Sequence, residues 1–120
     1  MKLNPECLKD LLIFIEENST PYNPAIIESD CVPEALAKYD MAEIEYHLGQ
    51  ARMSGLLDNY KKNIIGDLKI SGLTPNGHQL LEQLRTPKVW KEVLKKCVSS
   101  IPTLISCVSE IVGLAEMFTK

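Results

Sequence analysis

The stretch from Met53 to Arg85, MSGLLDNYKKNIIGDLKISGLTPNGHQLLEQLR, contains the local signals that decide the fold. Gly55 is well placed to end a helix, because glycine readily adopts the left-handed conformation found after many helix C-termini. Two runs that favour β structure follow, Leu56–Tyr60 and Gly66–Ile70, on either side of the polar Lys-Lys-Asn at 61–63. We therefore predict a helix end followed by a short β-hairpin.

Threonine-proline pairs open the next two helices. Thr74 can cap a helix that has Pro75 at its first position, where proline costs the helix no hydrogen bond. Thr86 and Pro87 repeat the pattern, so that a further helix begins at Lys88. The side chains expected on the inner faces are Gly77, Leu80, Leu81 and Leu84 in the first of these helices, and Trp90, Val93, Leu94, Cys97 and Val98 in the second.

The N-terminal third begins with another helix. Asn4 is an N-cap residue before Pro5, and apolar residues spaced three and four apart predict an amphipathic helix from Asn4 to about Asn18. Prolines between Ser19 and Pro33 forbid a long helix there and leave room for a brief extended piece near Ala25–Glu28. About two helical turns fit between Val32 and Tyr39.

Asp40 then caps a longer helix, with Glu43 three residues later as in a capping box. Helical spacing places one set of side chains on the inner face, namely Met41, Ile44, Leu48, Ala51 and Gly55. The residues expected to face outward are Ala42, Glu43, Tyr46, Gly49, Gln50 and Met53.

This order of elements predicts a mainly α protein with a small β-hairpin, in the α+β class. Two or three helices, a hairpin and a following helix are the layout of a winged helix-turn-helix domain, here with extra C-terminal helices. The helix after Asp40 is then the recognition helix and the hairpin is the wing. We expect the winged-helix domain to span residues 1–85 and a C-terminal helical extension to span residues 86–120.

Two segments resemble an uncharacterised winged-helix-like domain family of bacteria and their phages. They are EIEYHLGQARMSGLL at Glu43–Leu57 and LTPNGHQLLEQLR at Leu73–Arg85, followed by Trp90. The shared pattern is a helix ending in YHL, a GL pair, LTxxGHxxL and a downstream tryptophan, and the likeness covers roughly Leu3 to Lys96. The resemblance implies the winged-helix scaffold and a prophage setting, and it assigns no reaction.

Composition and charge limit the classes of protein to which this chain can belong. Hydrophobic residues make up 45% and charged residues 24% of 120 residues, which is typical of one soluble globular domain. The formal net charge of −3 divides unevenly, with −7 on residues 1–58 and +4 on residues 59–120. Attraction for an anionic partner must therefore come from the second half. The N-terminus lacks the pattern of a signal peptide, so we expect a cytoplasmic protein.

The sequence does not favour an enzyme or a metal centre. His47 and His78 fit packing or capping roles better than catalysis, and there is no glycine-rich phosphate loop or clearly placed carboxylate pair. We expect no cofactor. The thiols are expected to be reduced, because no CxxC pair occurs among Cys7, Cys31, Cys97 and Cys107.

The outward face of the helix after Asp40 holds the first candidates for DNA binding. Tyr46 and Gln50 would face base edges in the major groove, and Arg52 at the margin of the face could turn to a phosphate. Glu43 and Glu45 argue against this function, because phosphates repel carboxylates.

Lysines of the hairpin are the other candidates for DNA binding. Lys61 and Lys62 at the tip and Lys69 on the following strand would hold phosphates, or they are a solvated turn. So few cations predict weak, salt-sensitive binding by a monomer. A separate basic cluster suits either an acidic partner surface or a solvated helix face, and consists of Lys88, Lys91, Lys95 and Lys96.

A last helix is expected after Ser99 or Ser100, because Pro102 is tolerated only in a first turn. Its apolar residues recur three and four apart, and such a stripe needs a partner surface, for which we expect a second copy of the chain. Glu110 and Glu116 make a membrane span unfavourable. The residues predicted to mediate self-association are Ile101, Leu104, Ile105, Val108, Ile111, Val112, Ala115 and Phe118.

The leading hypothesis from the sequence is a small prophage-type winged-helix protein that binds duplex DNA as an accessory transcriptional regulator. It would form a homodimer or higher oligomer through its C-terminal helices. The alternative is a protein-interaction module on the same fold that does not bind DNA, for example a phage-encoded inhibitor or adaptor acting on a host protein. The acidic first half of the chain favours this alternative.

Overall fold

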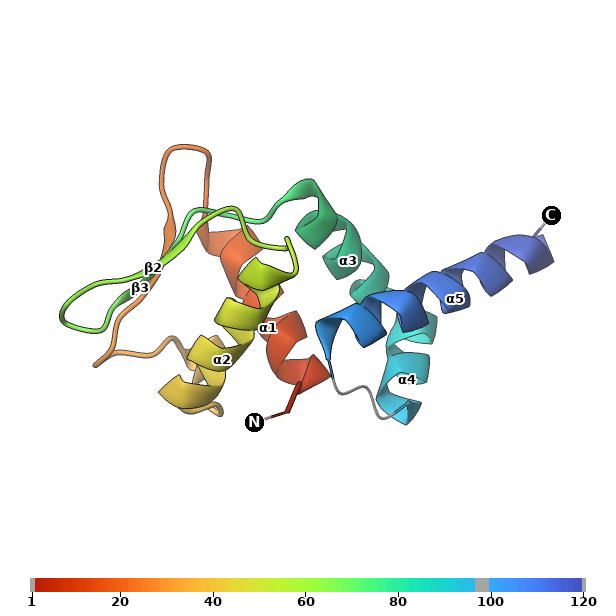
Figure 1. The fold of residues 1–120 in the computed structure, drawn as a ribbon, viewed down its shortest axis with the longest axis horizontal. Coiled ribbons are helices and arrows are strands. Elements are labelled where there is room, and N and C mark those ends of the chain that lie inside the picture. Colours follow the sequence, from red (N-terminus) through yellow and green to blue (C-terminus); the bar gives the residue numbers. More distant parts are fainter. Residues whose placement is uncertain (1, 97–99, 120) are drawn as a thin grey trace.

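The computed structural model describes residues 2–96 and 100–119, with the side chains of the last helix described as far as Val112. The chain is mainly helical with a small antiparallel sheet, which confirms the α+β class (Figure 1). In chain order the elements are α1 (Pro5–Asn18), β1 (Ala25–Ile27), the 3₁₀ turn η1 (Glu34–Leu36), α2 (Met41–Met53), β2 (Tyr60–Lys62), β3 (Leu68–Ile70), α3 (Pro75–Arg85), α4 (Pro87–Lys95) and α5 (Ile101–Thr119).

The helix starts follow from side-chain caps. The Asn4 side chain accepts a hydrogen bond from the backbone N–H of Glu6, 3.1 Å away, at the start of α1. Asp40 accepts one from the N–H of Glu43 at 2.8 Å to open α2, and Thr74 caps α3 in the same way. Each cap satisfies an N–H that has no partner inside its helix. The starts predicted from these residues are therefore confirmed.

The strands form one three-stranded antiparallel sheet in the order β1–β3–β2. On one face of the sheet Ala25, Ile27, Leu68 and Ile70 are buried, and β1 packs against α1. The extended piece predicted near Ala25–Glu28 is confirmed as β1. Because side chains alternate along a strand, the opposite face of the sheet is exposed to solvent.

The predicted boundaries of the hairpin were wrong. Lys61 and Lys62 belong to β2, and the turn runs from Asn63 to Asp67, whereas the expected turn was 61–63. Gly66 has a φ of +95°, a conformation that favours glycine and closes this turn. The run expected as the first strand begins instead with two leucines, Leu56 and Leu57, that are buried in the core.

Helices α3, α4 and α5 pack on one another, and α3 packs on α1, at the opposite end of the molecule from the hairpin (Figure 1). The inner face of α4 consists of Val89 and Val93, both buried. Leu94, which we expected on this face, is 56% exposed, because it points away from the face of α4 that holds the two buried valines. The inner-face predictions for Cys97 and Val98, and the cap at Ser99, lie outside the described residues.

Trp90 links α4 to α1. It packs against the hydrophobic core, and the Lys9 ammonium lies over its ring at 4.3 Å from the centroid. This geometry is that of a cation–π contact. Buried side chains from Leu3 to Val108 form one continuous cluster, so the C-terminal helices share the core of the preceding elements.

Candidate macromolecular interface

Helix α2 and the hairpin β2–β3 lie side by side and form one end of the molecule (Figure 1). This end carries the residues that the sequence assigned to DNA binding. Three sets of contacts fix the position of α2, the first two to α1 and the third to the hairpin.

The first contact is made by His47, whose side chain is completely buried. Its Nε2 atom accepts a hydrogen bond from the backbone N–H of Asn4 at 2.8 Å, and its Nδ1 atom lies 2.7 Å from the carbonyl oxygen of Glu43. An Nε2 acceptor and an Nδ1 donor require the neutral ring. His47 therefore holds α2 against the start of α1, in the packing role that we expected.

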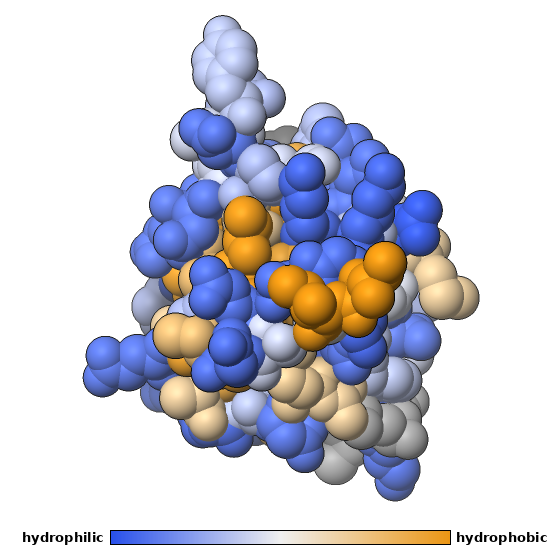
Figure 2. Space-filling model, turned by 90° about the vertical axis from the view of Figure 1, so that its left-hand side faces the viewer, coloured by the Kyte–Doolittle hydropathy of each residue, from blue (hydrophilic) through white to orange (hydrophobic). Residues whose placement is uncertain are grey.

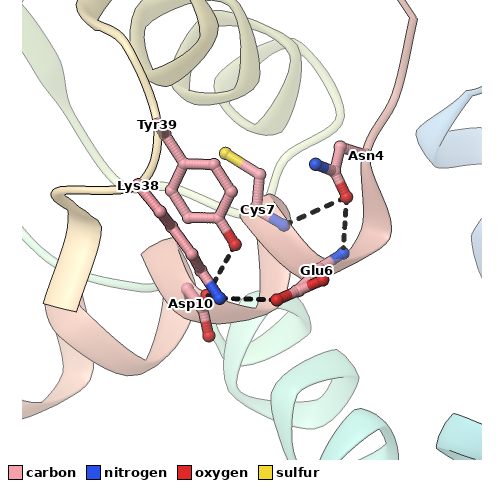
Figure 3. A network of polar contacts seen from close by, with 6 residues as sticks. All are labelled: Asn4, Glu6, Cys7, Asp10, Lys38 and Tyr39. Atoms are coloured by element: carbon pink, nitrogen blue, oxygen red, sulfur yellow. Dashed lines mark hydrogen bonds and ion pairs between the residues drawn. The ribbon is translucent and has the colours of Figure 1, made fainter.

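The second contact is a polar network that joins α1 to the residues just before α2 (Figure 3). Lys38 forms ion pairs with Glu6 and Asp10. The hydroxyl of Tyr39 donates a hydrogen bond to Asp10 at 2.6 Å. Burial raises the pKa of Tyr39, and the hydrogen bond to Asp10 raises it further. The connection into α2 is therefore anchored at two adjacent positions.

Cys7 lies beside this network on the buried side of α1 (Figure 3). Burial raises the pKa of its thiol to about 12, and the nearby carboxylates of Glu43 and Asp10 add to the effect. A thiol of this kind is not a nucleophile at neutral pH, because the thiolate is the reactive form. Cys7 is thus a packing residue.

The third contact joins the hairpin to α2. Lys62 on β2 forms an ion pair with Glu45 on α2, with 2.7 Å between Nζ and Oε1. Hydrogen bonding to Glu45 raises the pKa of Lys62, so the ammonium stays charged. Lys62 is therefore directed at α2, and its charge is partly neutralised there by Glu45.

The remaining residues predicted for DNA binding have different degrees of exposure. Tyr46 and Gln50 are half-buried on α2, and Arg52 is exposed near its C-terminal end. Lys61 and Lys69 are both exposed on the outer face of the sheet, directly opposite each other on β2 and β3. These five residues therefore lie on α2 and on both strands of the adjoining hairpin, and whether they bind DNA stays a prediction.

The sequence reasoning missed the apolar tip of the hairpin. Ile64 and Ile65 are 105% and 74% exposed, and Ile26 on β1 is 52% exposed. Figure 2, which looks onto this end, shows hydrophobic surface gathered among polar side chains. No role was assigned to Ile64 and Ile65 from the sequence, although two adjacent isoleucines before Gly66 were the available signal.

Contacts from the segment that follows β1 brace this tip. The hydroxyl of Ser29 donates to the carbonyl oxygen of Ile65 at 3.1 Å, and the N–H of Ser29 donates to Asp67 at 2.9 Å. Asp67 in turn donates its N–H to the side chain of Asn63 at 2.8 Å, while the N–H of Asn63 donates to the Asp67 carbonyl at 3.0 Å. The two isoleucines are therefore presented on a closed, hydrogen-bonded turn.

The residues predicted for self-association lie on α5, away from this end. Ile101, Leu104 and Val108 are buried within the core of the chain itself, against α3 and α4. Three further side chains are partly buried against the same core, namely Ile105, Ile111 and Val112. The side chains of Ala115 and Phe118 lie outside the described residues.

Other charged groups have local partners. Glu16 on α1 lies 3.0 Å from Arg85 and 3.6 Å from His78 on α3. In the basic cluster, Lys95 pairs with Glu92 at 3.7 Å. Among the described residues, no group of three or more histidine, cysteine, aspartate or glutamate side chains could hold a metal ion. Within the same residues, no helix combines the length and apolar character needed to cross a membrane.

Comparisons with known proteins place the chain in a family. It is similar to an uncharacterised protein of Haemophilus influenzae, with 24% identity over 102 residues that cover 83% of this chain and 80% of the relative. No solved structure matches the chain. A family model described as "Hypothetical protein (DUF2513)" matches residues 2–102, and the chain therefore belongs to this family.

Proposed function

We propose that this chain is a winged helix-turn-helix protein that acts as a protein-docking module. The winged-helix assignment is supported by the order of helix, strand, short helical turn, helix and hairpin, and by the sheet order β1–β3–β2. In this assignment η1 and α2 form the helix-turn-helix, and the hairpin is the wing. The fold alone does not set the function, because the site decides what a scaffold binds.

The observation that carries the docking function is the braced pair Ile64-Ile65 at the hairpin tip. Large exposed apolar side chains are common singly, but a rigid cluster of them marks an interaction site. Ile26 adds an exposed apolar side chain on β1 of the same sheet. A turn of polar residues could connect the two strands equally well, so the connection itself does not explain the two isoleucines. Contact with a binding partner does.

Charge on α2 favours a protein as that partner. Asp40, Glu43 and Glu45 lie at the start of the helix, and Glu45 binds Lys62, one of the lysines that would otherwise hold a phosphate. A helix with this charge is repelled by a polyanion. The chain would then act as a small adaptor or inhibitor that occupies another protein, in the phage-related setting that the sequence motifs imply.

Affinity purification from host cells, with three forms of the full chain, tests this function. Wild-type chain should retain a protein that the double variant Ile64→Ser/Ile65→Ser loses. The control variant Leu94→Ser, which removes an exposed apolar side chain on α4, should retain it. Binding must then be reproduced with the purified partner. A partner set that is identical for all three forms would refute docking through the tip.

DNA binding, as an accessory transcriptional regulator, is the second candidate function. It is favoured by Arg52, Lys61 and Lys69, which are exposed on this end and form no ion pair among the described residues. Tyr46 and Gln50 would face the bases.

A salt titration with mixed-sequence duplex DNA tests the second candidate. Three phosphate contacts predict that the logarithm of the binding constant falls with the logarithm of salt concentration with a slope of about −2.7. The variant Lys61→Ala/Lys69→Ala should flatten this slope to about −0.9, since one contact remains. No measurable binding at low salt would exclude this function.

A further inference from the structure

We propose that the partner is a protein segment in which an apolar side chain is flanked by carboxylates, and that it binds across the outer face of the sheet. This inference rests on the proposed docking function and adds the chemistry of the partner. It depends on one row of side chains, one pocket and the charges around them.

The row runs across all three strands. Ile26 on β1 is paired with Lys69 on β3, and Lys69 is paired with Lys61 on β2. The three side chains project to the solvent face, because their neighbours Ala25, Ile27, Leu68 and Ile70 are buried on the other face. An apolar position and two cations therefore stand next to one another at strand spacing, about 5 Å.

The two lysines form a like-charged pair. Like charges directly opposite each other on neighbouring strands destabilise a sheet. Lys62, one residue along, has Glu45 as its counter-ion, but no carboxylate within the described chain pairs with Lys61 or Lys69. A carboxylate from a partner could bind both ammonium groups and remove their repulsion.

A pocket of about 300 Å³ lies at this row. Ile26 contributes its apolar wall, and Lys61, Lys69 and Asn63 line its polar side. The pocket is large enough for one apolar side chain. A leucine or phenylalanine could enter it while adjacent carboxylates bind the lysines, so apolar and ionic contacts come from one short segment.

Acidic groups around the tip distinguish this partner from DNA. Glu28 and Asp30 are exposed directly after β1, beside Ser29, which contacts the hairpin tip. Asp67 lines the pocket itself. A nucleic acid would bring a continuous row of phosphates past these carboxylates, at a cost in repulsion. A protein segment can place its few carboxylates only where the lysines are.

The closed turn prepares this surface for binding. Ser29 and Asn63 hold Asp67, and hence the hairpin tip, through the hydrogen bonds described above. A surface that is already ordered loses less conformational entropy when a partner binds. The isoleucines at the tip would then contact the partner beside the pocket without a prior rearrangement.

Titration of the ¹⁵N-labelled full chain with synthetic peptides, followed by NMR, tests the chemistry. The probe is a short peptide with a central leucine pair between aspartates, and its matched control has lysines at the aspartate positions. We expect shift changes at the amides of Ile26, Lys61 and Lys69, and at least about tenfold weaker binding of the control. Equal binding of both peptides, or shift changes confined to α4 and α5, would overturn the inference.

A charge reversal sharpens the test. The variant Lys61→Glu/Lys69→Glu should prefer the lysine peptide over the aspartate peptide. These positions are exposed, so the hairpin should keep its fold, which the NMR spectrum of the variant checks directly. An unchanged preference in a folded variant would show that the lysines do not select the partner.

Failure here can be separated from failure of the docking function. If affinity purification yields a partner that depends on Ile64 and Ile65 while the peptides show no charge preference, only the partner chemistry is wrong. If duplex DNA displaces the aspartate peptide and binds with the slope given above, both the chemistry and the docking function are wrong. If the chain itself dimerises through this face, sedimentation should show an oligomer that the charge-reversal variant loses, and the inference also fails.

Discussion

Gly77 on α3 lies directly against the backbone carbonyl of Leu56, so closely that a Cβ atom at position 77 would overlap the carbonyl oxygen. The same oxygen accepts a hydrogen bond from the N–H of Thr74 at 3.0 Å. The start of α3 is therefore packed directly against the backbone at Leu56, in the segment that follows α2. This gives a physical reason for glycine in the motif LTPNGH, because a side chain at the third position of α3 would collide with this carbonyl.

The variant Gly77→Ala should be less stable than the wild type by about 1–3 kcal/mol, because the backbone at Leu56 has to shift to admit the methyl group. The measurement is the free energy of unfolding from urea titration. Gly49→Ala on α2 is the matched control, since nothing lies within 4 Å of the added Cβ. Alanine there should stabilise the helix by about 1 kcal/mol. Equal effects of both substitutions would contradict the close approach at Leu56.

The two histidines provide a second matched pair. His47→Ala removes a buried ring that bonds the N–H of Asn4 and leaves a cavity, so the free energy of unfolding should fall by about 3 kcal/mol. His78 has a half-exposed side chain near Glu16, so His78→Ala should change the free energy of unfolding by less than about 1 kcal/mol. Calorimetry can rank the two variants. A mild effect at position 47 would mean that α2 is not held through this ring.

Most of the fold was predictable from local signals, and the hairpin shows where such signals fail. Asn4, Asp40 and Thr74 act on residues two or three positions along the chain, so the sequence alone locates the helix starts. The turn at the hairpin tip is instead closed partly by Ser29, which lies 36 residues before the Ile65 carbonyl that it bonds. A contact between residues so far apart in the sequence cannot be predicted from the residues next to the turn.

The candidate site was predictable to the same extent. The lysines were visible in the sequence, but their roles depend on pairing across strands. Lys62 pairs with Glu45 on α2, whereas Lys61 lies opposite Lys69. The difference arises because adjacent side chains on β2 point to opposite faces of the sheet. Exposure of Ile64 and Ile65 likewise depends on the position of the turn, which was predicted incorrectly from the sequence.

The buried thiol of Cys7 should make the protein less stable in alkali. In the unfolded chain a cysteine ionises near pH 9, whereas in the folded chain the pKa of Cys7 is about 12. The stability associated with this difference is fully present below pH 9 and is lost as the pH rises toward 12, because only the unfolded state gains the thiolate. Tyr39, whose pKa is also raised by burial, adds a loss that starts near pH 10.

Urea midpoints measured from pH 8 to pH 11 test this prediction. The variant Cys7→Ala should lose stability at every pH but show a shallower decline above pH 9 than the wild type. Cys31→Ala, which changes an exposed thiol, should follow the wild-type curve. Parallel curves for the wild type and Cys7→Ala would show that the thiol does not contribute to the alkaline loss.

Self-association through α5 stays a prediction, and the structure indicates where to cut the chain to test it. Removing Ser99–Lys120 would expose α3 and α4, because Ile101, Leu104 and Val108 fill the core against them. A chain that ends after Val112 keeps these side chains and should retain the melting temperature of the wild type. If the end of α5 joins two copies, sedimentation should show an oligomer for the full chain and a monomer for the shortened one. Identical sedimentation of both would leave no role for residues 113–120 in self-association.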